Sequence, residues 1–185
     1  MNNNFQYRLS NNQKNEIAQN LIDFLQKDTE LIELTREFIC DWILTGPNEK
    51  RKAFFDVWDI VLKNYLPTTT PILFRACERL GKNGKIASFT GQLKAARRFS
   101  NCRGSIILCD TKEMLQFEEE LYQPGQYKHT FYPLHSVLEK ARALGGCGFR
   151  ERFLDEYIGE DEYIMRIDLD EMCCFKWMKD SLLNW

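Results

Sequence analysis

The segment PTTTP, residues 67–71, divides the 185-residue chain into two parts with different hydrophobic patterns. Proline has no backbone N–H and disfavours helical backbone in the residue before it, so a helix cannot continue through this segment. Before Pro67 the apolar residues recur every three or four positions, and after Pro71 they come in short runs broken by glycine. The sequence therefore predicts an α+β fold, with a helical N-terminal lobe over residues 1–66 and one compact mixed core over residues 67–185.

Three amphipathic helices are expected in the first part. NEIAQNLIDFL places its apolar residues on one stripe, and Asn11 or Asn12 is available as its N-cap. ELIELTREFICDWIL and AFFDVWDIVLKNYL repeat the pattern, and GPNE separates them.

Short strands alternate with helices in the second part. We expect strands over ILFRAC, IASFT, SIILC, EYIMRIDL and CCFKW, with a turn at GKNGK. Helices are expected over GQLKAARRFS, TKEMLQFEEELYQ and HSVLEKARALGG, the last of which ends at a glycine pair.

Composition limits the classes of partner. Hydrophobic residues make up 44% of the chain and aromatic residues 13%, which is typical of a folded domain. The net charge of −2 provides no basic field for nucleic acid or an anionic membrane, so neither is expected as a partner. The N-terminus lacks the apolar core of a Sec signal peptide, which predicts a cytoplasmic protein or secretion into a host cell by a specialised, non-Sec system. The oligomeric state stays open.

Metal and histidine chemistry are not expected. The seven cysteines are scattered without a CxxC pair or a Cys/His metal spacing, so we expect reduced thiols packed in the core. The chain has only two histidines, His129 and His135, which leaves too few for a typical zinc site.

Three polar features follow one another in the second part. Arg75 lies inside the apolar strand ILFRAC, Ser88 and Thr90 flank Phe89 at the end of a second strand, and GEDEYIMRID opens on two glutamates. If the backbone is already extended there, Glu160 and Glu162 project from the same face, because side chains alternate across a strand.

These features resemble the arginine-type mono-ADP-ribosyltransferases, a toxin-like family with Arg, then Ser-x-Ser/Thr, then Glu-x-Glu. LFRA resembles the family's arginine strand, ASFTGQLKAARRF its serine strand and following helix, and GEDEYIMRID its Glu-x-Glu strand. The resemblance covers about residues 70 to 170. Ala76 stands where the family usually has glycine, and Phe89 where a small polar residue is common.

The resemblance implies a core of packed β-sheets, NAD as co-substrate, and a target protein as partner. It also implies a bacterial effector, a virulence toxin or a phage-encoded modifier that transfers ADP-ribose to a side chain, most readily arginine. Residues Ser88, Phe89 and Thr90 would line the NAD site. The stretch GCGFRERFLDEYIG ahead of Glu160 would be the loop that meets the target, with Phe153 or Tyr157 as an aromatic contact.

The chemistry of the reaction agrees with the implied roles. Cleavage of the nicotinamide–ribose bond builds positive charge on the ribose, and a fixed carboxylate, Glu162, would stabilise it. Glu160 would orient or deprotonate the incoming nucleophile. Arg75 would bind pyrophosphate or ribose oxygens, and Ser88 would hold the catalytic glutamate.

Two other functions are compatible with the same residues. One is a non-enzymatic interaction protein on the same fold, whose helical lobe binds a partner. The other is an NAD glycohydrolase, which sends ADP-ribose to water; Glu160 argues only weakly against it.

Overall fold

The computed structural model describes residues 8–27, 29–46, 49–78, 83–100, 104–116 and 118–176. Its N-terminal helices are α1 (Asn11–Gln26), α2 (Glu33–Leu44) and α3 (Lys52–Asn64), which confirms the three predicted ones. The later helices are α4 (Leu93–Ser100), α5 (Thr111–Leu115), α6 (Glu118–Leu121), α7 (Leu134–Ala143) and α8 (Glu151–Ile158). The strands are β1 (Ile72–Cys77), β2 (Ile86–Thr90), β3 (Ser105–Asp110), β4 (Phe131–Pro133), β5 (Glu162–Arg166) and β6 (Cys173–Lys176). The predicted α+β class is confirmed.

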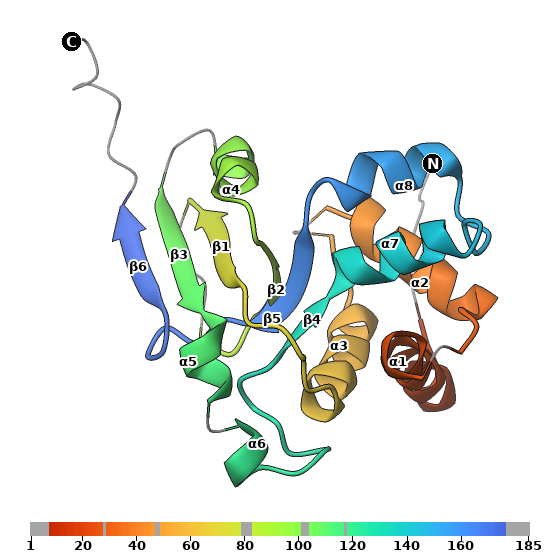
Figure 1. Cartoon of the computed structure of the whole chain (residues 1–185), viewed down its shortest axis with the longest axis horizontal. Coiled ribbons are helices and arrows are strands. Elements are labelled where there is room, and N and C mark those ends of the chain that lie inside the picture. Colours follow the sequence, from red (N-terminus) through yellow and green to blue (C-terminus); the bar gives the residue numbers. More distant parts are fainter. Residues whose placement is uncertain are drawn as a thin grey trace.

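The strands form one antiparallel sheet in the order β4-β5-β2-β1-β3-β6. The two central strands are barely joined, because β1 pairs with β2 only where Phe74 lies opposite Thr90. By contrast, β2 pairs with β5 from Ile86 to Thr90. The expectation of packed sheets was wrong for the described strands, because helices rather than a second sheet cover the apolar faces (Figure 1).

A layer of helices covers one face of the sheet. Helix α3 contacts β2 and β4, α7 contacts β5, and α1 packs against both helices (Figure 1). Their buried residues form one cluster that runs from Ile17 in α1 to Ile164 in β5 and includes Trp42, Trp58 and Tyr132. Residues of the expected helical lobe therefore share a hydrophobic core with the sheet, whose burial drives the two parts together.

A second apolar cluster occupies the other face. It contains Leu73, Phe89, Ile107 and Met165, and α5 packs against it through Met114 among others. Helix α4 contacts β1 and β2, the two strands that meet at a single pair.

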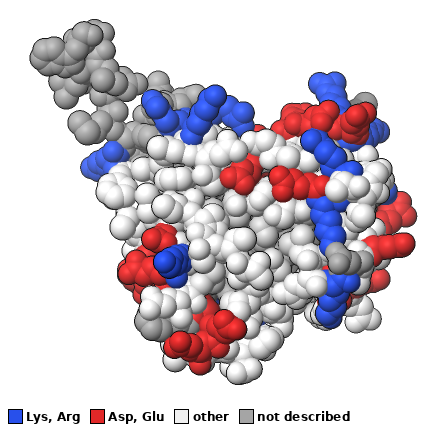
Figure 2. Space-filling model, viewed as in Figure 1, with Lys and Arg blue, Asp and Glu red and all other residues white. Residues whose placement is uncertain are grey.

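Charge on the face seen in Figure 1 is unevenly placed. Figure 2 shows basic side chains gathered over α4, at the top of the view, where the last turn carries Arg97 and Arg98. Acidic side chains lie between them and the part of the face formed by α7 and α8.

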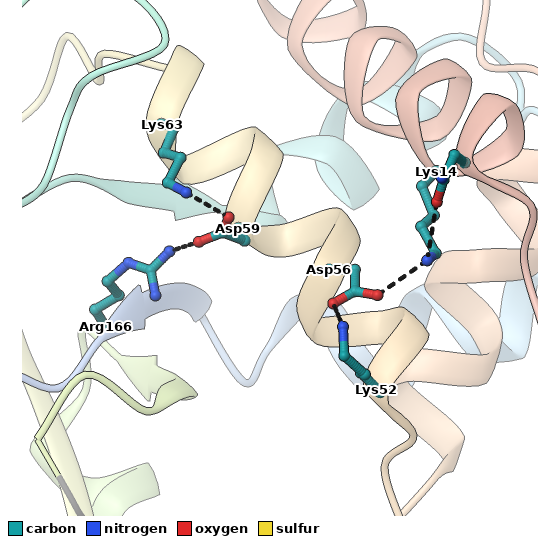
Figure 3. Close-up of polar contacts among 7 residues, drawn as sticks. Lys14, Lys52, Asp56, Asp59, Lys63 and Arg166 are labelled. Atoms are coloured by element: carbon teal, nitrogen blue, oxygen red, sulfur yellow. Dashed lines mark hydrogen bonds and ion pairs between the residues drawn. The ribbon is translucent and has the colours of Figure 1, made fainter.

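Two aspartates on α3 tie this helix to its neighbours (Figure 3). Asp59 pairs with Arg166 on β5 and with Lys63, 2.7 Å away on its own helix. Asp56 pairs with Lys14 of α1 at 3.0 Å. These pairs link the helical layer to the sheet and the first helix to the third.

Several local expectations need correction. The stretch before Glu160 contains helix α8 rather than only a loop, because Phe153, Leu154, Tyr157 and Ile158 recur at helical spacing. Ser10, not an asparagine, caps α1 through a capping box with Gln13. The short strand β4 was not predicted, and TKEMLQFEEELYQ forms two short helices.

Some expectations fall partly outside the described residues. These are residues 47 and 48 of GPNE, residues 81 and 82 of the predicted turn, Cys102, residue 117 within TKEMLQFEEELYQ, and residue 177 at the end of the last strand. The described cysteines are free thiols, but only Cys109 is buried, and Cys173 and Cys174 are exposed on an edge strand. Cys77 and Cys147 are half-buried and pack against the two apolar clusters. The expectation of thiols packed in the core therefore holds for these two and for Cys109, and it is wrong for Cys173 and Cys174.

Candidate functional site

A cavity of about 330 Å³ opens where the helical layer meets the middle of the sheet. Its walls come from β1, β2, α4, the end of α2 and the segment that leads into α3. Six of the eight residues singled out in the sequence line it: Arg75, Ser88, Phe89, Thr90, Glu160 and Glu162. Folding thus brings together motifs that are up to 87 positions apart, from Arg75 to Glu162.

The two aromatic residues expected to contact the target lie outside the cavity. Phe153 and Tyr157 do not line the cavity, and both pack from α8 against the helical core. Their ring centroids lie 4.8 Å apart, and Phe149 stacks on Phe153. The Tyr157 carbonyl oxygen accepts a hydrogen bond of 3.2 Å from the Glu160 backbone N–H, so the end of α8 leads directly into the turn that presents Glu160.

Glu162, the first residue of β5, is half-buried at the cavity wall. Its Oε1 accepts a hydrogen bond of 3.1 Å from Trp42 Nε1, and the carboxylate also accepts one from the Ser88 hydroxyl. Burial raises the pKa of Glu162, while these two hydrogen bonds and the charges of Lys50 and Arg75 oppose the rise. The carboxylate is thus held in a fixed orientation in a weakly hydrated place.

Arg75 lies where β1 and β2 separate. Its Nη1 donates a 2.6 Å hydrogen bond to the Ser88 carbonyl oxygen, which replaces a strand-to-strand bond at this point. Its Nε is buried without a hydrogen-bond partner among the described residues. Burial lowers the pKa of Arg75, and the Glu162 charge opposes this. A half-buried guanidinium whose buried Nε donor is unused is suited to bind an anionic or hydroxyl-bearing ligand.

Glu160 precedes the strand instead of belonging to it. Asp161 has a φ of 51°, in the left-handed region, so the backbone is not extended between the two glutamates. The alternation expected for a strand is therefore wrong here, although both glutamates line the cavity. Burial raises the pKa of Glu160, and Arg98, whose Nη2 lies 2.8 Å from Oε1, opposes the rise.

The turn that presents Glu160 is fixed on several sides. Thr90 Oγ1 donates to the Glu160 carbonyl oxygen at 2.8 Å, so Thr90 positions the backbone. The Asp161 carboxylate points to His135, with Nδ1 and Oδ1 3.5 Å apart. Gly91 allows this arrangement, because a Cβ there would lie 2.3 Å from Asp161 Oδ2.

Two residues from the helical part, Trp42 and Lys50, also line the cavity and were not predicted as site residues. Trp42 is 1% exposed and was expected only as an inward-facing residue, yet its indole N–H holds Glu162. The Lys50 ammonium lies 3.5 Å from the centroid of the Trp42 ring and also donates to the Trp42 carbonyl oxygen. Burial lowers the pKa of Lys50 to about 8. The only available signal was that a buried tryptophan usually finds a partner for its N–H.

Family models, curated proteins and solved structures were each compared with the chain, and none of them matches it. Among the described residues, no group of His, Cys, Asp and Glu is arranged to hold a metal ion. No helix in the same part of the chain is long and apolar enough to cross a membrane.

Proposed function

We propose that the protein is an NAD-dependent mono-ADP-ribosyltransferase that modifies an arginine side chain of a target protein. The observation that supports this most is the convergence of Arg75, Ser88 and Glu162 on one cavity, with Ser88 bonded to both of the others. The proposal rests on this geometry and on the resemblance of the three motifs.

The position of Glu162 suits the chemistry of the first step. When the bond between nicotinamide and ribose breaks, positive charge develops at the ribose C1′. A carboxylate that is already oriented needs no reorganisation to stabilise this charge, and burial strengthens the interaction. Trp42 and Ser88 supply that orientation from two different elements.

The residues around the cavity are compatible with one end of NAD. A volume of about 330 Å³ lies at the lower end of the range for small-molecule sites, which is enough for the nicotinamide ribose but not for the whole dinucleotide. Arg75 and Lys50 bring positive charge to a cavity that would receive a pyrophosphate-bearing ligand. The unused Nε of Arg75 is the donor that we assign to that ligand.

The proposal is tested by incubating purified protein with NAD. We expect release of nicotinamide, and an increase in Tm because NAD binds only the folded protein. NAD at a hundred times its Kd adds about 2.7 kcal/mol to the unfolding free energy, or about 5 to 10 °C for a chain of this size. Absence of both effects at millimolar NAD would contradict the proposed function.

Glu160→Gln should separate transfer from hydrolysis. Glu160 acts on the incoming guanidinium, so transfer to an arginine-containing acceptor should fall about a hundred-fold or more, while nicotinamide release to water continues. The measurement follows both products in parallel. Glu151→Gln, an exposed carboxylate on α8, is the matched control and should change neither. Equal loss of both reactions in Glu160→Gln would show that the two glutamates do not divide the work.

The pH dependence of nicotinamide release should report Glu162. Stabilisation of the ribose needs the ionised carboxylate, so the rate should fall as pH drops through its pKa, which burial places above the ordinary glutamate value. Trp42→Phe removes a hydrogen bond to the charged form. The acid limb should therefore move to higher pH in this variant.

Trp58→Phe is the control for this experiment. Trp58 is as deeply buried in the same aromatic cluster, but its Nε1 has no partner among the described residues. The control therefore loses a similar packing volume without losing a bond to Glu162. If both variants move the acid limb equally, the effect comes from packing and not from the N–H.

NAD hydrolysis is a second candidate activity. The carboxylate assigned to the acceptor is already occupied by Arg98, which leaves water as a competing nucleophile. An NAD glycohydrolase would release nicotinamide at the same rate with and without an acceptor, and would label no protein.

A further inference from the structure

The carboxylate assigned to the acceptor already binds a guanidinium in this structure. Arg98 Nη2 donates to Glu160 Oε1 at 2.8 Å, and the two residues are 62 positions apart in the sequence. Glu160 lines the cavity, as do Ala96 and Phe99 of the helix that carries Arg98. An arginine of the protein itself therefore lies beside the group on which a target arginine would act.

The Arg98 side chain that contacts Glu160 lies at the protein surface and not in the core. The side chain of Arg98 is 64% exposed, that of Glu160 is 25% exposed, and the guanidinium carbon lies 5.1 Å from the Phe99 ring centroid. An exposed ion pair of this kind is screened by water and contributes little to folding. The ion pair places the Arg98 side chain beside the cavity. Because the pair is weak, a ligand can displace the guanidinium from Glu160 at little cost.

We propose that Arg98 is an acceptor built into the protein, so that the site transfers ADP-ribose to its own Arg98 when no target is present. This inference rests on the proposed function and names the acceptor class as a guanidinium.

The reaction balances with NAD as the only co-substrate. The bond between C1′ of the ribose and the nicotinamide nitrogen breaks, and nicotinamide leaves with the bonding electron pair. A guanidino nitrogen of Arg98 forms the new bond to C1′ and loses a proton to Glu160, from which it passes to solvent. No oxidant or reductant is required.

Modification of Arg98 should prevent the addition of a second ADP-ribose to the same chain. Each chain has one Arg98, and its ADP-ribose group would place two phosphates beside the carboxylate of Glu160. These phosphates would repel the pyrophosphate of a second NAD, and the attached group would fill the place of a second acceptor. The expected stoichiometry is one ADP-ribose per chain.

The test is intact-mass analysis of the purified chain after incubation with NAD, with nicotinamide measured in the same samples. We expect addition of one ADP-ribose, which peptide mapping places on Arg98. The ADP-ribose adduct should be absent in Arg98→Lys and Glu160→Gln. It should remain in Arg97→Lys, the matched control at the preceding position on α4. Thermal unfolding of Arg98→Lys should match the wild type, because the side chain is exposed.

A small guanidine competitor gives a second arm. Agmatine should be modified and should suppress labelling of Arg98, because both acceptors need Glu160. Labelling that agmatine leaves unchanged would overturn the proposal.

The outcomes separate this inference from the proposed function. Nicotinamide release without modification of Arg98 would overturn the inference and leave the proposed function standing. Absence of nicotinamide release would overturn both. Labelling that persists in Glu162→Gln would also overturn the inference, because the adduct would then form without the site.

Discussion

Glu162→Gln should reduce nicotinamide release from NAD about a hundred-fold or more, because loss of one fixed electrostatic contact in a transition state has an effect of this size. The substitution keeps the shape of the side chain and an oxygen that can accept from Trp42 and Ser88. Transfer and hydrolysis should fall together, since both begin with the same bond cleavage. The measurement is nicotinamide release with and without an acceptor.

The stability of Glu162→Gln provides the control for folding. Burial raises the pKa of Glu162, so the folded protein binds this proton more tightly than the unfolded chain does. The stability contributed by the protonated carboxyl is complete below the unfolded pKa and is lost as pH rises through the folded pKa. Glutamine has no proton to lose, so the Tm of the variant relative to wild type should increase as the pH rises from below the ordinary glutamate pKa of about 4.3 through the higher pKa of the folded protein.

Two results would contradict this assignment of Glu162. Full nicotinamide release by a folded Glu162→Gln variant would remove Glu162 from the reaction. If the Tm difference between variant and wild type is the same at both ends of the pH range, the carboxyl titrates as in the unfolded chain. The Glu162 carboxylate would then not be buried and hydrogen-bonded at the cavity wall.

Arg75→Ala should weaken NAD binding more than it weakens folding. Removal of one partner from a buried, hydrogen-bonded charged contact costs about 2 to 5 kcal/mol in binding, which corresponds to an increase in Kd of about thirty-fold or more. Folding also suffers, because the Ser88 carbonyl oxygen loses its donor, at a cost of about 1 to 3 kcal/mol. Titration of NAD by calorimetry, next to denaturant unfolding, measures both effects.

Arg166→Ala is the matched control. Arg166 is a second half-buried arginine on a strand, it bonds Asp59 and the Gly84 carbonyl oxygen, and it does not line the cavity. Its loss should lower stability without changing the Kd for NAD. If the two variants bind NAD equally well, Arg75 is a structural residue and our assignment is wrong.

The sequence was sufficient for the main elements of the fold. The Pro67–Pro71 boundary, the three helices before it and five of the strands follow from backbone chemistry and from the period of the apolar residues. The short strand β4 was missed, because three residues are too few to show a period. Helix α8 was missed because the resemblance implied a loop ahead of Glu160, although Phe153, Leu154 and Tyr157 recur at helical spacing.

The order of the three motifs could also be recognised from the sequence, and the cavity brings their residues together. The hydrogen-bond partners of these residues could not be predicted. Trp42 holds Glu162 across 120 positions, and Arg98 holds Glu160 across 62. An amphipathic pattern records which side of a helix is buried, so it placed Trp42 inside. Which atom the indole N–H meets depends on how the helical layer is seated on the sheet. The hydrogen-bond partner of Trp42 cannot be predicted from the local sequence, because the packing of the whole core determines which atom lies beside the indole N–H.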